Sequence, residues 1–227
     1  MRIPLTKYGW PQVVALPAIV ASAMLIASVG WPDHWPARGL VLVEAALAIT
    51  LIWILCFFRD PRRAVPTDKN VLLAPADGKV TDIGIVEEND FIGGAALRIG
   101  IFLSIFDTHI NRAPCNVKVE KVTYRPGKYK NAMIPKSGLV NESNDLGLLR
   151  TDNPQDRLIV RQISGAIARR IVCATVQGKS LAGGEKFGMI KFGSRTELYL
   201  PVRENAKCLV RIGDKVKAGM SPLVRYE

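Results

Sequence analysis

The pair Gly193-Ser194 is the strongest candidate for chemistry in this sequence. A serine hydroxyl can attack the carbonyl of the residue before it. A glycine at that position puts no Cβ in the way and tolerates strained backbone angles. Elimination from the resulting ester would convert Ser194 into a pyruvoyl group at a new N-terminus. Most Gly-Ser pairs are ordinary turns, so support for self-cleavage must come from the rest of the chain.

Five short motifs supply that support. They read Phe-Phe-Arg-Asp-Pro-Arg-Arg, Leu-Ala-Pro-Ala-Asp-Gly-Lys-Val, Asp-Thr-His-Ile-Asn-Arg-Ala-Pro, Gln-Ile-Ser-Gly with Ala-Arg-Arg-Ile, and Phe-Gly-Ser-Arg, at residues 57–63, 73–80, 107–114, 162–171 and 192–195. In this order they resemble phosphatidylserine decarboxylase in its short, membrane-anchored bacterial and archaeal form. The resemblance implies a carboxy-lyase of phospholipid biosynthesis that converts phosphatidylserine to phosphatidylethanolamine and CO₂.

The resemblance also implies roles for single residues. Ser194 would be the pyruvoyl precursor, and autocatalytic cleavage after Gly193 would give a long fragment, 1–193, and a short fragment, 194–227. His109 would be the catalytic base, and Asp77 would orient it and stabilise its imidazolium form. Asp77 also suits the first residue of a tight Asp-Gly turn.

One position departs from the family pattern. Longer members carry a second histidine three residues after the first, and this chain has Arg112 there. Either His109 serves both self-processing and decarboxylation, or one of the two steps uses another group. Arg112 could bind a carboxylate or phosphate of the substrate or pair with a surface acid, and Asn111 is a further weak candidate for substrate binding.

The expected cofactor is the pyruvoyl group derived from Ser194. Loss of CO₂ from an amino acid leaves a carbanion, and a carbonyl bonded to the substrate amine can accept its electrons, as pyridoxal phosphate does in other enzymes. We expect no pyridoxal phosphate and no metal, because no motif for either is visible. The four cysteines, Cys56, Cys115, Cys173 and Cys208, lie far apart without a Cys-x-x-Cys pair.

Two apolar segments precede these motifs, at residues 11–29 and 40–58. Each is close to the ~20 residues that a helix needs to cross a bilayer. Basic residues precede the first segment and follow the second, which predicts that both ends lie in the cytoplasm. We therefore predict a membrane-anchoring helical hairpin over 1–63, with the catalytic domain on the cytoplasmic face of the cell membrane. A hairpin that enters only one leaflet is an alternative, since both segments are only just long enough.

The remainder, residues 64–227, is predicted to be a β-rich catalytic domain. Short β-branched runs alternate with turn residues at 79–85, 96–103, 117–124, 157–162, 171–176, 196–200 and 207–211. This pattern indicates an antiparallel barrel or sandwich, and the tail at 213–219 resembles lipoyl and biotinyl barrels. The best short helix candidate spans 164–171.

The charge of the chain indicates its partners. The formal net charge is +11, and residues 59–227 carry almost all of it. A basic domain beside apolar segments favours an anionic membrane surface; nucleic acid is disfavoured, because no basic run is interleaved with aromatics. The expected partners are therefore a phospholipid substrate, the membrane and the chain's own cleaved fragment, with a homodimer left open. Two rivals also stay open: a pyruvoyl decarboxylase for another amino-acid headgroup, and a membrane-tethered, lipoyl-like adaptor without catalysis.

Overall fold

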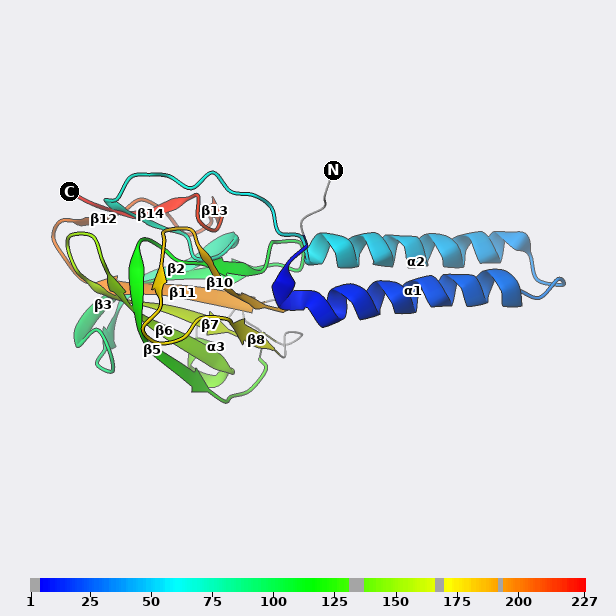
Figure 1. Ribbon diagram of the computed structural model, residues 1–227, viewed down its shortest axis with the longest axis horizontal. Coiled ribbons are helices and arrows are strands. Elements are labelled where there is room, and N and C mark those ends of the chain that lie inside the picture. The colour runs from blue at the N-terminus through cyan, green and yellow to red at the C-terminus, as the bar shows by residue number, and fades with distance from the viewer. Residues whose placement is uncertain (1–4, 131–136, 166–169, 192–193) are drawn as a thin grey trace. The chain divides into compact units, whose positions relative to one another are not determined.

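The computed structural model of the protein describes residues 5–130, 137–165, 170–191 and 194–227. It contains two compact units, Met1–Pro61 and Arg62–Glu227. The first is helical, and the second is built mainly from strands (Figure 1). The predicted fold class, mainly β with an apolar N-terminal helix pair, is therefore confirmed.

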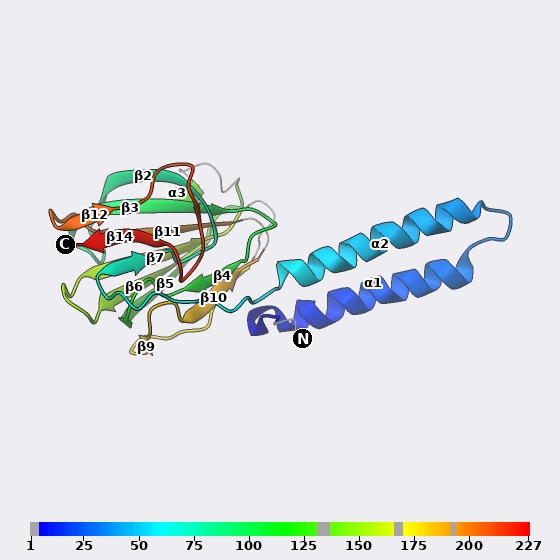
Figure 2. The same cartoon turned by 90° about the horizontal axis from the view of Figure 1, so that it is seen from above.

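The helical unit contains a short 3-10 helix, η1 (Lys7–Gly9), followed by α1 (Trp10–Gly30) and α2 (Ala37–Phe57). Both α-helices are long and apolar enough to cross a membrane. They lie side by side and run in opposite directions (Figure 2). One polar contact joins them, since the Ser28 hydroxyl donates a hydrogen bond to Glu44 Oε1 at 3.0 Å. Helix α1 extends one residue beyond each end of its predicted segment, whereas α2 begins three residues earlier and ends one residue earlier than its segment.

The second unit contains three antiparallel sheets. Their strands are β1 (Val71–Leu73), β2 (Gly78–Glu88), β3 (Gly94–Leu103), β4 (Ile110–Arg112), β5 (Val117–Arg125), β6 (Ser143–Arg150), β7 (Arg157–Ile163), β8 (Ile171–Cys173), β9 (Ser180–Leu181), β10 (Lys186–Ile190), β11 (Ser194–Pro201), β12 (Ala206–Cys208), β13 (Lys215–Val216) and β14 (Pro222–Tyr226). A short helix, α3 (Ser137–Val140), precedes β6. The largest sheet has the order β13-β2-β3-β11-β7-β6-β5-β9, and the two smaller ones have the orders β1-β14-β12 and β4-β10-β8.

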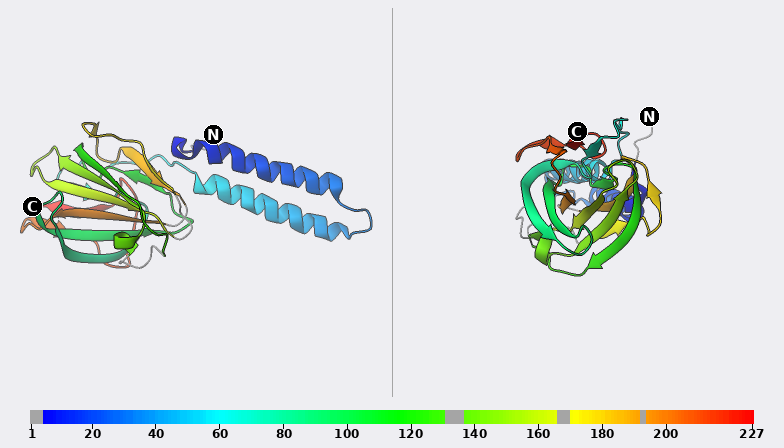
Figure 3. Two further views of the ribbon diagram at one scale, coloured as in Figure 1. Left: turned by 90° about the horizontal axis from the view of Figure 1, so that it is seen from below. Right: turned by 90° about the vertical axis from the view of Figure 1, so that its left-hand side faces the viewer.

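The large sheet curls into a partly open barrel (Figure 3). Strand β11 lies at its centre, paired with β3 along one edge and β7 along the other. All seven predicted strands are present, although β8 ends at Cys173, before the predicted end at residue 176, and β12 ends at Cys208, before the predicted end at residue 211. The short helix expected at 164–171 is absent at its described ends, because Ser164 and Gly165 are irregular and Ile171 begins β8; residues 166–169 lie outside the described part of the chain.

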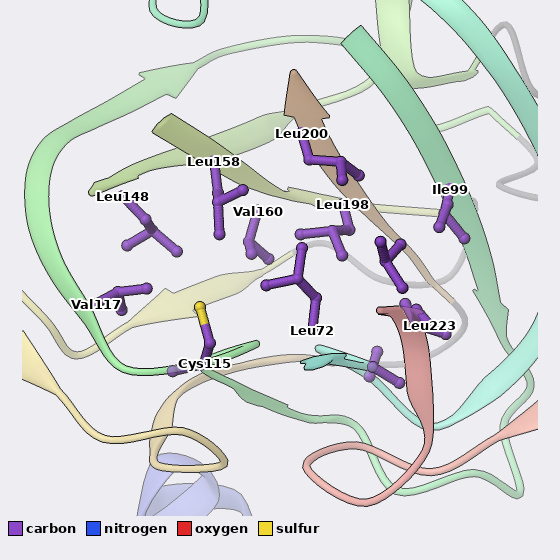
Figure 4. Close-up of a cluster of buried hydrophobic side chains, with 14 of the residues drawn as sticks. Leu72, Ile99, Cys115, Val117, Leu148, Leu158, Val160, Leu198, Leu200 and Leu223 are labelled. Carbon is purple, nitrogen blue, oxygen red and sulfur yellow. The ribbon is translucent and has the colours of Figure 1, made fainter. Parts of the chain in front are cut away.

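The hydrophobic core fills the space between the inner face of the large sheet and the sheet formed by β1, β14 and β12 (Figure 4). Leu198 and Val160 are directly opposite each other on neighbouring strands, and Leu72 and Leu223 reach them from the smaller sheet. All four side chains are fully buried. Burial of this apolar surface drives the sheets together, and it fixes the side of β11 that faces inward.

Candidate active site

Two connections between strands are held against each other at one end of the β-rich unit. Leu103 at the end of β3 pairs with Ser194 at the start of β11. The backbone carbonyl of His109, just before β4, accepts a hydrogen bond from the amide of Ile190 at the end of β10, at 3.1 Å. The two ends of the β3–β4 connection are therefore paired with the two ends of the β10–β11 connection.

Ser194 lies on the inner face of β11, and His109 comes directly before β4 at the same end of the unit. The side chain of Asn111 donates a hydrogen bond to Thr196 Oγ1 at 3.0 Å. His109 precedes Asn111 by two residues, and Ser194 precedes Thr196 by two. Side chains two residues apart on an extended chain point to the same face. The strand pairings thus place the residues predicted to be the base and the nucleophile at the same end of the unit, and both are fully buried.

The inner face of the large sheet changes from apolar to polar toward this end. Leu198 and Val160 occupy one row, and Thr196 and Gln162 occupy the next, where Gln162 Nε2 donates to Asn111 Oδ1 at 2.9 Å. Beyond that row come Ser194 and its neighbours. Hydrophobic burial and the hydrogen bonds of this polar row therefore hold β11, the strand that begins with Ser194, in its position.

The imidazole of His109 has one defined tautomer. Its Nδ1 lies 2.9 Å from the backbone carbonyl oxygen of Asp107. A carbonyl can only accept a hydrogen bond, so Nδ1 carries a proton, and in the neutral ring Nε2 is the basic nitrogen. The turn that supplies this carbonyl is held by its own bonds, since the Ser104 amide donates to Asp107 Oδ2 at 2.8 Å. Nε2 is consequently prepared to accept a proton.

Four buried oxygens near this end have no hydrogen-bond partner among the described residues. They are Ser194 Oγ, Ser164 Oγ, Thr108 Oγ1 and Glu142 Oε2. Arg195 pairs with Ile163, so Ser164, the next residue after β7, lies opposite Ser194. The Ser164 amide in turn donates a hydrogen bond to the Glu142 carbonyl at 2.9 Å. Unsatisfied buried polar atoms are costly and rare. Four such oxygens at one end of the unit are typical of an active site, where buried polar groups form hydrogen bonds to a reacting group.

Asp77 is buried at the start of β2 but has partners of its own. Its carboxylate accepts a hydrogen bond from Arg63 Nη2 at 2.6 Å and from the amide of Ala218 at 2.8 Å. These contacts join the beginning and the end of the β-rich unit. The orienting contact that the structure describes at His109 Nδ1 comes instead from the Asp107 carbonyl, and a catalytic role for Asp77 stays a prediction.

Arg112 and Asn111, the two weak candidates for substrate binding, are both buried in β4. Arg112 Nη1 donates to the carbonyl of Gly184 at 3.0 Å. Asn111 bonds to Thr196 and Gln162 in the polar row. Both side chains therefore have structural contacts, and their role toward a substrate stays a prediction.

Sequence reasoning missed Lys191, Ser164 and Thr108. Lys191 is buried, and its amide donates to the carbonyl of Arg170 at 3.2 Å. Burial, and then the charge of Arg170, lowers the pKa of the Lys191 ammonium. Its position three residues before Ser194 was the available signal.

The predicted cleavage residue Gly193 lies outside the described residues. Within the described part of the chain, no group of three or more His, Cys, Asp or Glu side chains could hold a metal ion.

Comparison with known proteins gives one consistent result. A model of the phosphatidylserine decarboxylase family matches residues 51–223. The phosphatidylserine decarboxylase proenzyme of Symbiobacterium thermophilum is 43% identical over 226 residues, which covers 99% of this chain and 97% of the relative. The proenzymes of the same name from Carboxydothermus hydrogenoformans and Rhodopirellula baltica are 40% and 42% identical, with 100% and 99% of this chain covered and 100% and 89% of the relatives.

Proposed function

Because this chain belongs to the phosphatidylserine decarboxylase family and is a decarboxylase, we propose that it is a proenzyme that cuts itself between Gly193 and Ser194. The mature enzyme then decarboxylates phosphatidylserine to phosphatidylethanolamine. The relatives carry the word proenzyme in their names, which supports processing. The observation that carries the proposal is the buried Ser194 hydroxyl, which has no partner among the described residues and lies at the same end of the β-rich unit as the buried His109.

Cleavage begins with the Ser194 hydroxyl. Its Oγ attacks the carbonyl carbon of Gly193 while Nε2 of His109 takes the hydroxyl proton. The peptide C–N bond then breaks and its nitrogen gains a proton, so an ester joins the two residues. The buried hydroxyls of Ser164 and Thr108 lack partners, and they are suited to donate hydrogen bonds to the oxyanion that forms during this step.

Elimination completes the maturation. Removal of the Ser194 α-proton expels the Gly193 carboxylate and leaves a Cα=Cβ double bond at residue 194. Tautomerisation to an imine and hydrolysis by water release ammonia and leave a pyruvoyl group at the start of the fragment 194–227. That carbonyl supplies the electron sink that decarboxylation of an amino acid requires.

Positive charge near the site suits an anionic lipid headgroup. Lys191 and Arg170 are joined through their backbones, and the charge of Arg170 is felt at Lys191. A phosphodiester bound here would form charge-assisted hydrogen bonds with these cations, and these bonds would offset the cost of removing the phosphate from water. His109, placed beside residue 194, would then move the proton that replaces CO₂ at the substrate Cα.

The helical unit gives the lipid enzyme a membrane anchor. Helices α1 and α2 have the length and apolarity of membrane spans, and the flanking basic residues favour a cytoplasmic location for both ends. A bilayer anchor suits an enzyme whose substrate headgroup stays at the membrane surface. We place the catalytic unit on the cytoplasmic face on this basis.

The test is the intact mass of the purified protein under denaturing conditions. We expect the wild-type chain to separate into fragments 1–193 and 194–227, with the smaller one lacking an N-terminal amine. The Ser194→Ala variant should remain a single chain of about 24.9 kDa, because it has no hydroxyl to attack Gly193. Ser180→Ala, which changes an exposed serine in β9, is the control and should be cut like the wild type. An uncut wild-type chain would refute self-processing.

A further inference from the structure

The outer face of the large sheet carries a set of ion pairs that the reaction does not use. It faces away from the hydrophobic core, because β11 turns Leu198 and Leu200 inward and Arg195 and Glu197 outward. We call this set the charge ladder. Its members are Arg98, Arg195, Arg161, Arg125, Asp82, Glu197, Asp145, Asp90 and Tyr199.

Arg195 is the centre of the charge ladder and directly follows the proposed pyruvoyl precursor. Its guanidinium is fully buried. Nε donates to Glu197 Oε1 at 2.7 Å, Nη1 donates to Thr81 Oγ1 at 2.7 Å, and Nη2 contacts both carboxylate oxygens of Asp82. This arginine therefore ties β11 to β2, two strands away in the sheet.

The charge ladder continues in the other direction through Glu197. Its Oε2 accepts a hydrogen bond from the Tyr199 hydroxyl at 2.5 Å, and that hydroxyl accepts one from Arg161 Nη1 at 3.2 Å. Arg161 forms two bonds to Asp145, at 2.7 and 2.8 Å, and Asp145 also pairs with Arg125. The contacts thus cross β11, β7, β6 and β5 in the order of the sheet.

A glycine in β3 makes the central contact possible. Gly100 is the register partner of Glu197. A Cβ atom at Gly100 would overlap the Arg195 guanidinium and the Asp82 carboxylate. The absence of a side chain at Gly100 therefore lets Arg195 pass over β3 and reach Asp82 on β2.

We infer that the charge ladder holds residue 194 in place after the chain is cut, with Arg195 as the positioning residue. This inference rests on the proposed cleavage. After cleavage, Arg195, Glu197 and Tyr199 belong to the short fragment, and their partners on β2 and β7 belong to the long one. Residue 194 then has a covalent link on its C-terminal side alone, and the next residue is held by its side-chain contacts to β2 and by its backbone pairing with β3 and β7.

Side chains along β11 alternate between the inner and the outer face of the sheet, so the position of this strand matters for every one of them. A slip of one residue would turn the inward side chains outward and would carry Arg195 into the hydrophobic core. Removing one partner of a buried ion pair leaves an uncompensated charge, which is strongly unfavourable. The charge ladder therefore resists any shift of the short fragment along or across the sheet, and residue 194 keeps its position opposite Leu103 at the end of β3.

The test compares Arg195→Lys with Arg225→Gln in the full-length protein. Lysine keeps the charge of Arg195 but loses its planar fork of donors. Arg225 pairs with Asp68 at 3.1 Å and also joins the two fragments, but this pair is exposed and should contribute little. The measurements are the rate of self-cleavage by intact mass, and kcat and KM with phosphatidylserine vesicles.

We expect Arg195→Lys to lower kcat by ~10-fold or more with KM within about 2-fold, because a small misplacement of a reacting group affects the chemical step. Self-cleavage should slow as well, since Ser194 is positioned by the same contacts. Arg225→Gln should match the wild type. An unchanged kcat for Arg195→Lys, or a change in KM alone, would overturn the inference.

A second variant covers the case in which Arg195→Lys does not fold. Thr81→Val removes one acceptor, the one 2.7 Å from Arg195 Nη1, and should give a smaller loss of kcat with the same unchanged KM. An unchanged kcat there would refute the role of Arg195. An uncut wild-type chain would overturn both this inference and the proposed function, whereas a cut wild type with normal variants would overturn the inference alone.

Discussion

At the scale of single residues, the local turn around His109 matters as much as the histidine itself. The Asp107 carbonyl at Nδ1 leaves Nε2 as the basic nitrogen. A buried histidine without such an orienting acceptor could present the wrong tautomer to the Ser194 hydroxyl. The motif that contains Asp107 and His109 therefore supplies both the proposed base and the carbonyl that orients its ring.

Replacing His109 by glutamine tests this assignment. Glutamine can still donate to the Asp107 carbonyl but cannot accept the proton of Ser194, so self-cleavage should slow by about 10²–10⁴-fold. The measurement is the time course of intact mass after synthesis of the chain. His34→Gln changes the other histidine, which is exposed in the connector between α1 and α2, and should be cut at the wild-type rate. Normal cleavage of the His109 variant would assign the base to another group.

At the scale of elements, β11 combines two different faces in one strand. Ser194 and Thr196 continue the inward row of leucines, and Arg195 and Glu197 form the centre of the charge ladder. All four side chains are buried, so this strand is covered on both faces. A strand with chemistry on one face and an anchor on the other is suited to carry the reactive residue.

The inward polar row should contribute measurably to stability. In Thr196→Val, the Asn111 amide loses its 3.0 Å acceptor and keeps a longer bond, 3.4 Å, to the Pro75 carbonyl. We expect the free energy of unfolding to fall by about 1–3 kcal/mol. The measurement is urea unfolding in detergent in the Ser194→Ala background, where a single chain is expected. Thr67→Val, at an exposed site, should stay within ~0.5 kcal/mol, and equal midpoints for the two variants would contradict the prediction.

Most of the long strands could be predicted from sequence, and of the strands with two or three residues only β8 and β12 were predicted. Alternating β-branched residues mark β2, β3, β5 and β11 because each is long enough to show a period of two. Strands of two or three residues, such as β4, β9 and β13, show no period at all. Strand β6 was missed for another reason: it begins with the polar residues Ser143, Asn144 and Asp145, whose burial depends on partners in β5 and β7.

At the scale of the whole molecule, the proposed cut would divide one fold between two chains. The fragment 194–227 would contribute β11 and β13 to the large sheet and β12 and β14 to a smaller one. Leu198, Leu200 and Leu223 would still fill the core. The pairing of β11 with β3, about a hundred positions earlier, could not be read from local patterns, since sequence periodicity carries no information on long-range partners.

The helical unit can be tested by the accessibility of its connector. We expect the connector between α1 and α2 to face the outside of the cell, because the basic residues flanking the helices favour the cytoplasm. In a chain whose four native cysteines are replaced by alanine, His34→Cys should react with a membrane-impermeant maleimide in intact cells. Lys207→Cys, at an exposed position of the β-rich unit, should react only after lysis.

The two cysteine variants together distinguish the membrane arrangements. Protection of both in intact cells would favour a hairpin that enters and leaves the cytoplasmic leaflet, with the catalytic unit still inside. Labelling of Lys207→Cys in intact cells would place the catalytic unit outside and would contradict the proposed topology. Labelling of His34→Cys alone requires two full crossings. Helices of 21 residues each at 1.5 Å per residue reach about 30 Å, the thickness of the hydrocarbon core, so we expect the full crossing.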